Sequence, residues 1–234
     1  MPKRPYHHIP IQECNEALIP IPGELFAVET PHPYEKLGAP YGGYSPYFLR
    51  ETVVEKLLIA QNNLQQQYPN WQIQIFDAYR PVSVQQFMVD YAFAEALQMK
   101  GFSSQDVSQI PPSQLEQIWE QVYQIWAPPS LDLATPPPHS TGSAVDITLV
   151  DDKGKVINMG SPIDEMSERS LPDYYREHTS HPQAKEFSHH RQLLCDVMVA
   201  AGFVRNPREW WHFSYGDQMW AWLSGETTAK YGRI

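Results

Sequence analysis

Two short segments of the chain hold residue types that can bind a divalent metal ion. His139 and Asp146 begin and end the segment 139–146 (HSTGSAVD), and His212 ends the segment 209–212 (EWWH). Two imidazoles and a carboxylate suit zinc, and hydrolytic zinc sites typically have three protein ligands and a fourth position for water, whose pKa falls to about 7. The three residues are therefore candidate ligands of a hydrolytic zinc site.

Two further residues have side chains that could carry out hydrolysis beside such a metal. Glu209 lies three positions before His212, close enough to act as general base on the attacking water. Arg80, in the segment 76–81 (FDAYRP), could stabilise the oxyanion that forms when water attacks a carbonyl group. Taken alone, Glu209 would be a surface residue, and Arg80 would by default be part of an ion pair at a strand end.

The candidate ligands also have ordinary structural interpretations. A histidine that follows two tryptophans, as His212 does, is more often packed in a core than bound to a metal. Asp146 lies in an apolar stretch, where a buried carboxylate is costly unless it is paired or bound to a metal. A salt bridge and a metal site explain Asp146 equally well, so it is the combination of residues that favours catalysis.

Taken together, these motifs resemble a known family, the zinc D-alanyl-D-alanine dipeptidases, which are the VanX-like branch of a group of peptidases that also includes D,D-carboxypeptidases. The family pattern is S-x-H-x-x-G-x-A-x-D followed by E-x-x-H, with D-x-Y-R-P upstream. In this chain the corresponding segments are 137–146 (PPHSTGSAVD), 209–212 (EWWH) and 77–81 (DAYRP). The segment 159–170 (MGSPIDEMSERS) also resembles the dipeptidase branch. The resemblance covers roughly residues 70–216.

The resemblance implies one zinc ion per chain, held by His139, Asp146 and His212. It also implies that Glu209 is the catalytic base. The implied reaction is hydrolysis of the dipeptide D-Ala-D-Ala to free D-alanine.

Two further roles follow from the same resemblance. Arg80 would stabilise the tetrahedral intermediate, and Asp164 would receive the free ammonium group of the dipeptide. The chain departs from the family pattern at Pro137, which stands where the family has a serine, so a hydrogen bond from that serine to the substrate is missing here. This departure affects the expected tightness and choice of substrate rather than the metal ligands.

Hydrophobic periodicity and turn residues predict the elements that must position these residues. The predicted helices cover residues 51–67, 81–100, 113–126 and 183–201, and the predicted strands cover 71–76, 143–150 and 209–215. A turn at 151–154 leads into a further extended stretch at Val156 and Ile157, and Gly142 is expected to have a positive φ. Residues i and i+3 of a regular strand face opposite sides, so Glu209 and His212 could not both point at one metal. We therefore expect an irregular start to the last strand.

The order of the predicted elements indicates an α+β fold. Helices and strands occur without regular β-α-β alternation, and no shift in composition marks a domain boundary. We expect a single domain over residues 1–234, with a small antiparallel sheet that carries the zinc site and is flanked by helices. Residues 1–50, rich in proline and tyrosine, would form an N-terminal extension packed on a catalytic core over 70–216.

Composition excludes several classes of protein. The chain has 234 residues and a formal net charge of −10, with no basic run, which argues against nucleic acid or an anionic membrane as a partner. No apolar stretch approaches the 18 residues of a membrane span. Two cysteines, Cys14 and Cys195, are too few for a disulfide framework and suit a reducing compartment, so a cytoplasmic location is expected. The oligomeric state is left open.

Other histidines and aromatic residues are weaker candidates. A second metal cluster could be drawn from His178, His181, His189 and His190, but a solvated surface is favoured because no carboxylate lies at a suitable spacing. His32 has no such context at all. Three tyrosines could form an aromatic wall over the site or could pack in the ordinary way: Tyr41, Tyr44 and Tyr47.

Two other functions fit the same residues. One is a D,D-carboxypeptidase that acts on peptidoglycan peptides, against which Asp164 counts because it would bind a free amino end. The other is a catalytically inactive, zinc-stabilised binding protein. The presence of Glu209 and Arg80 counts against that second alternative, because a structural zinc site usually has four protein ligands and needs no base.

Overall fold

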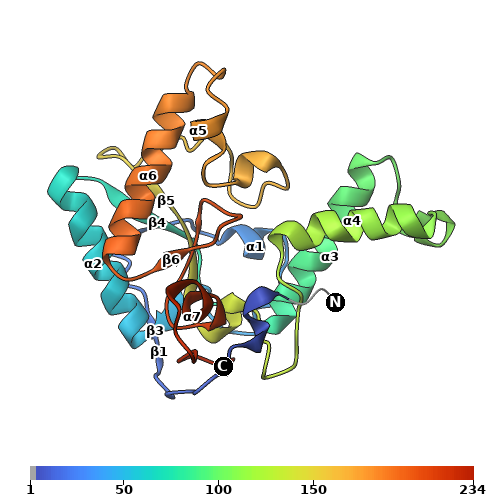
Figure 1. Ribbon diagram of the computed structural model, residues 1–234, viewed down its shortest axis with the longest axis horizontal. Helices are drawn as coiled ribbons and strands as arrows, with labels where there is room; N and C mark the ends of the chain where they lie inside the picture. Colours follow the sequence, from blue (N-terminus) through green and yellow to red (C-terminus); the bar gives the residue numbers. More distant parts are fainter. Residues whose placement is uncertain (1–3) are drawn as a thin grey trace.

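The computed structural model describes residues 4–234, apart from the side chain of Asp106, and its fold is α+β as predicted (Figure 1). The α-helices are α1 (Pro33–Lys36), α2 (Glu51–Gln67), α3 (Val82–Met99), α4 (Pro112–Ile125), α5 (Tyr174–Glu177), α6 (Ala184–Ala200) and α7 (Gln218–Ser224). The strands are β1 (Leu18–Pro20), β2 (Ala27–Val28), β3 (Phe48–Arg50), β4 (Gln72–Asp77), β5 (Ala144–Val150), β6 (Val204–Arg205) and β7 (His212–Ser214). Four short 3₁₀ helices complete the described elements: η1 (Pro5–His8), η2 (Ser104–Gln109), η3 (Pro138–Thr141) and η4 (Glu168–Ser170).

A five-stranded sheet at the centre of the molecule has the order β2-β4-β5-β7-β6. The four strands β4, β5, β7 and β6 are antiparallel, and β2 pairs with β4 in the parallel direction at one edge. A separate antiparallel pair is formed by β1 and β3. The small antiparallel sheet flanked by helices is therefore confirmed, with one parallel edge strand added from the N-terminal part of the chain.

Alternation along the strands divides the central sheet into an apolar face and a polar face. Ile73 and Ile75 of β4 and Ile147 of β5 are buried in the main hydrophobic core, together with residues of α2 and α6. In Figure 1, α2 and α6 lie together on one side of the sheet, whereas α3 and α4 form a second pair on the other side of the molecule. Because side chains alternate along a strand, Asp146 points away from the α2–α6 face.

The register of the sheet places three polar residues at one level. Asp77 of β4 is the partner of Asp146 in β5, and Asp146 is in turn the partner of His212 in β7. The pairing of β4 with β5 shifts between Ile75 and Asp77, an irregularity of the β-bulge type. Two residues from the predicted site, and the aspartate that precedes Arg80, thus lie side by side across three strands.

The long elements agree with the predicted ones to within one or two residues. The helix predicted over 51–67 is α2 (Glu51–Gln67), and the strand predicted over 143–150 is β5 (Ala144–Val150). The strand predicted over 209–215 is shorter, since β7 begins only at His212 after a turn and a bend, so its irregular start is confirmed. The predicted extended stretch after the turn at 151–154 is reduced to one isolated bridge between Val150 and Val156, because Lys155 and Val156 are exposed and no further strand lies beside them.

The first residues described lie against the end of the chain. The helix η1 packs against α7, and Ile11 forms a parallel bridge with Ala229. These two segments are the dark blue and dark red parts of Figure 1. Within residues 4–234, no helix is long and apolar enough to cross a membrane.

Candidate active site

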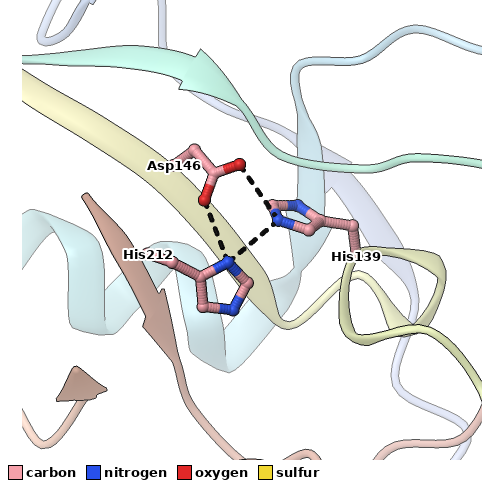
Figure 2. A group of neighbouring side chains, drawn as sticks. All are labelled: His139, Asp146 and His212. Atoms are coloured by element: carbon pink, nitrogen blue, oxygen red, sulfur yellow. Dashed lines mark hydrogen bonds and ion pairs between the residues drawn. The ribbon is translucent and has the colours of Figure 1, made fainter. Parts of the chain in front are cut away.

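The structure brings the three candidate ligands together into one buried cluster. His139 Nε2 lies 3.2 Å from Asp146 Oδ2, and His212 Nδ1 lies 2.9 Å from Asp146 Oδ1. The two ring nitrogens, His139 Nε2 and His212 Nδ1, are 3.2 Å apart. Figure 2 shows all three side chains pointing toward one point from three segments: a loop, β5 and β7. Ligand atoms from segments that are remote in the sequence therefore converge within 4.8 Å of one another.

The loop that carries His139 has a tight local geometry. The helix η3 (Pro138–Thr141) ends at Gly142, which has a φ of 70° as predicted. A side chain at this position would also collide with Leu18. The His139 ring is oriented by its other nitrogen, because Nδ1 lies 2.8 Å from the carbonyl oxygen of Ala78 and must donate to it. This leaves the Nε2 lone pair directed into the cluster.

The donor set fits a divalent cation. With its proton on Nδ1, His139 presents a lone pair at Nε2 to an oxygen of Asp146 only 3.2 Å away, and two acceptors at that distance need a proton or a cation between them. Two atoms that each lie about 2.0–2.1 Å from a tetrahedral zinc ion are separated by roughly 3.3 Å, close to the observed pairwise distances. The hydrogen bond from His139 to a backbone carbonyl is also the usual way in which a metal-binding histidine is held.

Charge interactions keep Asp146 ionised despite its burial. Burial alone would raise the pKa of this carboxyl group, but the hydrogen bonds and charges of His139 and His212 outweigh that effect and hold the pKa well below its usual range. Asp146 also lies 3.3 Å from the guanidinium of Arg80. The two alternatives for Asp146, a salt bridge and a metal site, are therefore compatible, because Asp146 contacts both Arg80 and the two histidines.

Glu209 is buried beside the cluster and does not lie on the surface. It follows Asn206-Pro207 in a turn, where its backbone N–H donates to the Asn206 carbonyl oxygen at 3.4 Å. Its Oε2 atom lies 3.6 Å from His212 Nδ1. Burial raises the pKa of Glu209 to about 7, although the positive charge of His212 acts in the opposite direction. A carboxyl group with a pKa near neutrality is suited to taking up and releasing a proton.

Arg80 is held rigidly in the wall of the site. Its guanidinium donates to Asp77 at 2.9 Å and to Gln85 at 2.9 Å, and Nη2 donates to the Tyr34 hydroxyl at 3.2 Å. The same group lies over the rings of Tyr34 and Trp126, about 5 Å from each centroid. The ion pair predicted as the ordinary role of Arg80 is thus present, with Asp77 as the partner, and it directs the guanidinium toward Asp146.

Asp164 is buried in the same cavity. It lies in the segment that follows β5 and has a φ of 65°. Aspartate and asparagine adopt this left-handed conformation more readily than most residues. The Tyr34 hydroxyl donates to its Oδ2 atom at 2.7 Å. Burial, together with the negative charge of Asp146, raises the pKa of Asp164 to about 8.

Four residues that sequence analysis did not single out for the site contact Arg80 or Asp77 there. They are His32, Tyr34, Gln85 and Trp126. His32 is buried, and its Nε2 atom lies 3.1 Å from Asp77 Oδ1, while its Nδ1 atom accepts from the backbone N–H of Tyr34. Only Gln85 had a sequence signal, since it lies about one helical turn beyond Arg80 in a helix that was predicted.

The suggested aromatic wall of three tyrosines is not formed at this site. Tyr41 and Tyr47 pack around His32, and Tyr44 is exposed against Tyr79. They line a separate hollow. The other histidine group is on the surface as favoured: His178, His181 and His189 are exposed, and His190 is partly exposed.

All six predicted site residues line one cavity of about 280 Å³: His139, Asp146, His212, Glu209, Arg80 and Asp164. Its remaining wall includes Arg4 and Tyr6 from the N-terminal segment, Trp126 from the end of α4, and Met219 and Trp222 from α7. A volume of this size accommodates a small polar molecule. Three side chains that can bind a metal ion thus converge beside a buried carboxyl group, that of Glu209, and a buried arginine, Arg80. This arrangement in an α+β protein defines a metal-dependent hydrolase.

Comparison with known sequences specifies the class further. The sequence profile of the D-Ala-D-Ala dipeptidase family, peptidase family M15, matches residues 28–229, and the chain belongs to this family. A D-alanyl-D-alanine dipeptidase of Synechocystis sp. is 50% identical over 244 aligned positions that span 100% of this chain and 98% of the relative. A D-alanyl-D-alanine dipeptidase of Escherichia coli is 41% identical over 76 residues, which is 32% of this chain and 36% of the relative.

A solved structure is also similar to the chain. It is the crystal structure of a mutant of VanY, a vancomycin resistance D,D-pentapeptidase from the VanB-type resistance cassette, in complex with Zn(II). The similarity covers 94% of this chain and 96% of the VanY chain, at 17% sequence identity and a TM-score of 0.42.

Proposed function

We propose that this chain hydrolyses D-alanyl-D-alanine to two molecules of D-alanine in a zinc-dependent reaction. The observation that carries the proposal is the 50% identity, across the whole chain, to a curated dipeptidase of this specificity. The local geometry supports it, because the six residues that the family resemblance implicates line one cavity.

His139, Asp146 and His212 are the residues that would hold the zinc ion. When bound there, zinc supplies a Lewis acid and lowers the pKa of a coordinated water molecule. The buried setting of the three ligands, each no more than 5% exposed, excludes competing solvent from the cluster.

The remaining residues bind the dipeptide and move its protons. The Asp164 carboxylate binds the substrate ammonium group, and the Arg80 guanidinium stabilises the oxyanion that develops on the scissile carbonyl. Glu209 takes a proton from the attacking water as the oxygen–carbon bond forms. Glu209 then gives this proton to the amide nitrogen as the carbon–nitrogen bond breaks, so that D-alanine leaves as a neutral amine.

We also propose that residues 70–216 form the catalytic core and that residues 1–50 are an extension packed on it. The pairing of β2 (Ala27–Val28) with β4 (Gln72–Asp77) supports this arrangement. A cytoplasmic location is proposed as well, since Cys14 and Cys195 form no disulfide, as is usual in a reducing compartment. Cell fractionation with an antibody to the chain would test the location.

The test of the proposed activity is hydrolysis by the purified, zinc-loaded protein. We expect turnover of D-Ala-D-Ala, none of L-Ala-L-Ala, and none of N-acetyl-D-Ala-D-Ala, whose blocked amino end cannot pair with Asp164. Glu209→Gln should lower kcat by a factor of about 10²–10⁴, the usual contribution of a general acid–base, while one zinc ion per chain remains bound. Turnover of the acetylated peptide equal to that of the free dipeptide would indicate a carboxypeptidase instead, and no turnover with zinc bound would refute the assigned substrate.

A further inference from the structure

The cavity contains an arginine for which the proposed reaction has no role. Arg4 lies in the N-terminal segment and lines the same cavity as the metal cluster. Its Nη2 atom donates to the carbonyl oxygens of Tyr123 at 2.6 Å and Trp126 at 3.1 Å. These bonds join the guanidinium to the C-terminal end of α4, so its position does not depend on the N-terminal segment alone.

The charge of Arg4 is not neutralised by the protein. Among residues 4–234, no carboxylate lies within 4.0 Å of its guanidinium, whereas Arg80 is paired with both Asp77 and Asp146. The Nε atom of Arg4 is buried and has no hydrogen-bond acceptor. A buried N–H group without an acceptor is costly, and a ligand that supplies an anionic oxygen would remove that cost.

Arg4 and Asp164 are held by different parts of the cavity wall. Asp164 Oδ2 accepts a hydrogen bond from the Tyr34 hydroxyl at 2.7 Å, and the same hydroxyl accepts one from Arg80 Nη2 at 3.2 Å. Arg4 is bonded instead to the carbonyl oxygens of Tyr123 and Trp126 at the end of α4. Asp164 and Arg80 therefore belong to one hydrogen-bonded group, and Arg4 is anchored separately in the same cavity.

The separate anchoring of these residues matches the charged groups of a free dipeptide. The ammonium group and the scissile carbonyl belong to the first residue, and the proposed partners of these groups are Asp164 and Arg80. The leaving nitrogen receives its proton from Glu209, and the carbon next to this nitrogen bears the C-terminal carboxylate. This carboxylate is the one charged group of the dipeptide without a partner so far, and Arg4 presents an unpaired charge to the same cavity.

We propose that Arg4 binds the C-terminal carboxylate of the dipeptide and so determines specificity for substrates that end one residue after the scissile bond. The inference rests on the proposed function, since it takes the dipeptide as substrate. With Asp164 for the ammonium group and Arg4 for the carboxylate, the cavity recognises both charges of a zwitterion. A longer peptide would place a neutral amide where Arg4 needs a carboxylate.

The test compares D-Ala-D-Ala with its C-terminal amide, D-alanyl-D-alaninamide, in the zinc-loaded protein. We expect kcat/KM to favour the free acid by about 10- to 100-fold, the contribution of a charged hydrogen bond, with most of the difference in KM. Arg4→Gln should remove this preference by lowering kcat/KM for the free acid far more than for the amide, and a zinc content of one ion per chain would show that the variant is folded. Arg4→Lys should keep part of the preference. Arg208→Gln removes an exposed arginine from the same cavity and should change neither substrate.

A binding measurement separates failure of this inference from failure of the proposed function. In a Glu209→Gln background, calorimetry should show tighter binding of the acid than of the amide, and loss of that difference on adding Arg4→Gln. Hydrolysis of acid and amide at equal rates would leave the dipeptidase intact and refute the role of Arg4. Loss of the preference for the acid in Arg208→Gln, with the preference kept in Arg4→Gln, would also refute it. If no dipeptide is hydrolysed but Arg4 still confers the binding preference, the proposed activity fails and the carboxylate site stands; if neither dipeptide binds, both fail.

Discussion

At the scale of single residues, the charge states in the cavity depend on one another. Burial gives Glu209 a pKa of about 7 and Asp164 a pKa of about 8, and the negative charge of Asp146 contributes to both increases. A divalent cation bound by Asp146 would offset that charge and would move both carboxyl groups toward their ionised forms. The base and the ammonium-binding group of the proposed reaction would therefore become ionised together when the metal binds.

The raised pKa of Asp164 predicts how the stability of the metal-free protein varies with pH. Between about pH 4 and pH 8 the unfolded chain releases the proton of this carboxyl group while the folded protein keeps it, so the free energy of unfolding falls as pH rises. Asp164→Asn removes this loss, and asparagine tolerates the left-handed backbone at this position. In chelator, the variant should gain more than about 1 kcal/mol over the parent between pH 5 and pH 8, as measured by urea unfolding.

The control for this experiment is Asp152→Asn, which changes an exposed aspartate in a turn. It should follow the parent protein across the same pH range. An equal pH dependence for Asp164→Asn and the parent would show that Asp164 is ionised in the folded, metal-free protein.

At the scale of elements, the parts predicted well are those whose residues carry their own signal. The helix α2 (Glu51–Gln67) has apolar residues at helical spacing and a Tyr-Pro-Asn stop, and the strand β4 (Gln72–Asp77) alternates cleanly. The helix α7 (Gln218–Ser224) was not predicted, because its buried residues contact η1 and the N-terminal segment. Contacts between distant segments leave no periodic pattern within either segment.

The residues of the site likewise fall into those with a local sequence signal and those without one. His139, Asp146 and His212 were recognisable because they lie in motifs whose residue types already define a chemistry. His32 and Arg4 lie outside any such motif, and each acquires its environment from residues that are remote in the sequence: His32 from Asp77, and Arg4 from the end of α4. Their places could not be inferred from local spacing.

Substitution of one glycine in the segment that leads to Asp164 should markedly lower the stability of the fold. Gly160 has a φ of 87°, and a Cβ atom there would lie 2.7 Å from Phe187 Cδ2 and still closer to the Tyr175 ring. Gly160→Ala should lower the free energy of unfolding by about 2–4 kcal/mol, because backbone strain adds to overpacking. Urea unfolding of the zinc-loaded protein would measure this loss.

Gly154→Ala is the matched control, since Gly154 also has a positive φ, of 74°, but a Cβ atom there would meet nothing within 4 Å. It should lose only about 1–2 kcal/mol, the cost of the backbone conformation. Equal losses for the two variants would mean that the packing around Gly160 adjusts without cost.

At the scale of the whole molecule, the first described residues and the C-terminal residues both pack beside the cavity. Gln218 donates to the carbonyl oxygens of Ile9 and Ala134. The backbone N–H of Ile234 donates to the carbonyl oxygen of Ser140, next to His139. The metal cluster lies inside this enclosure and joins a loop to two strands. Occupation of the cluster should therefore stabilise the whole fold.

Removal of the metal is the corresponding prediction. With zinc at about 1,000 times its Kd, binding contributes about 4 kcal/mol to the free energy of unfolding, which corresponds to a rise in Tm of roughly 10 °C for a chain of this size. A chelator should lower Tm by this amount, and added zinc should restore it, as followed by calorimetry. His139→Asn should abolish the response, and the control His189→Gln, which changes an exposed histidine, should preserve it. A Tm that changes with neither chelator nor zinc would contradict metal binding at this group of residues.

The alignment of Asp77, Asp146 and His212 across three strands has a consequence for folding. Side chains alternate between the two faces of a sheet, so a slip of one residue between β5 and β7 would turn His212 or Asp146 into the apolar core. A misaligned sheet then presents an incomplete set of ligands. Metal binding would therefore add to the hydrophobic effect in favouring the one strand pairing in which the proposed ligands meet, so that the same register completes both the apolar core and the metal site.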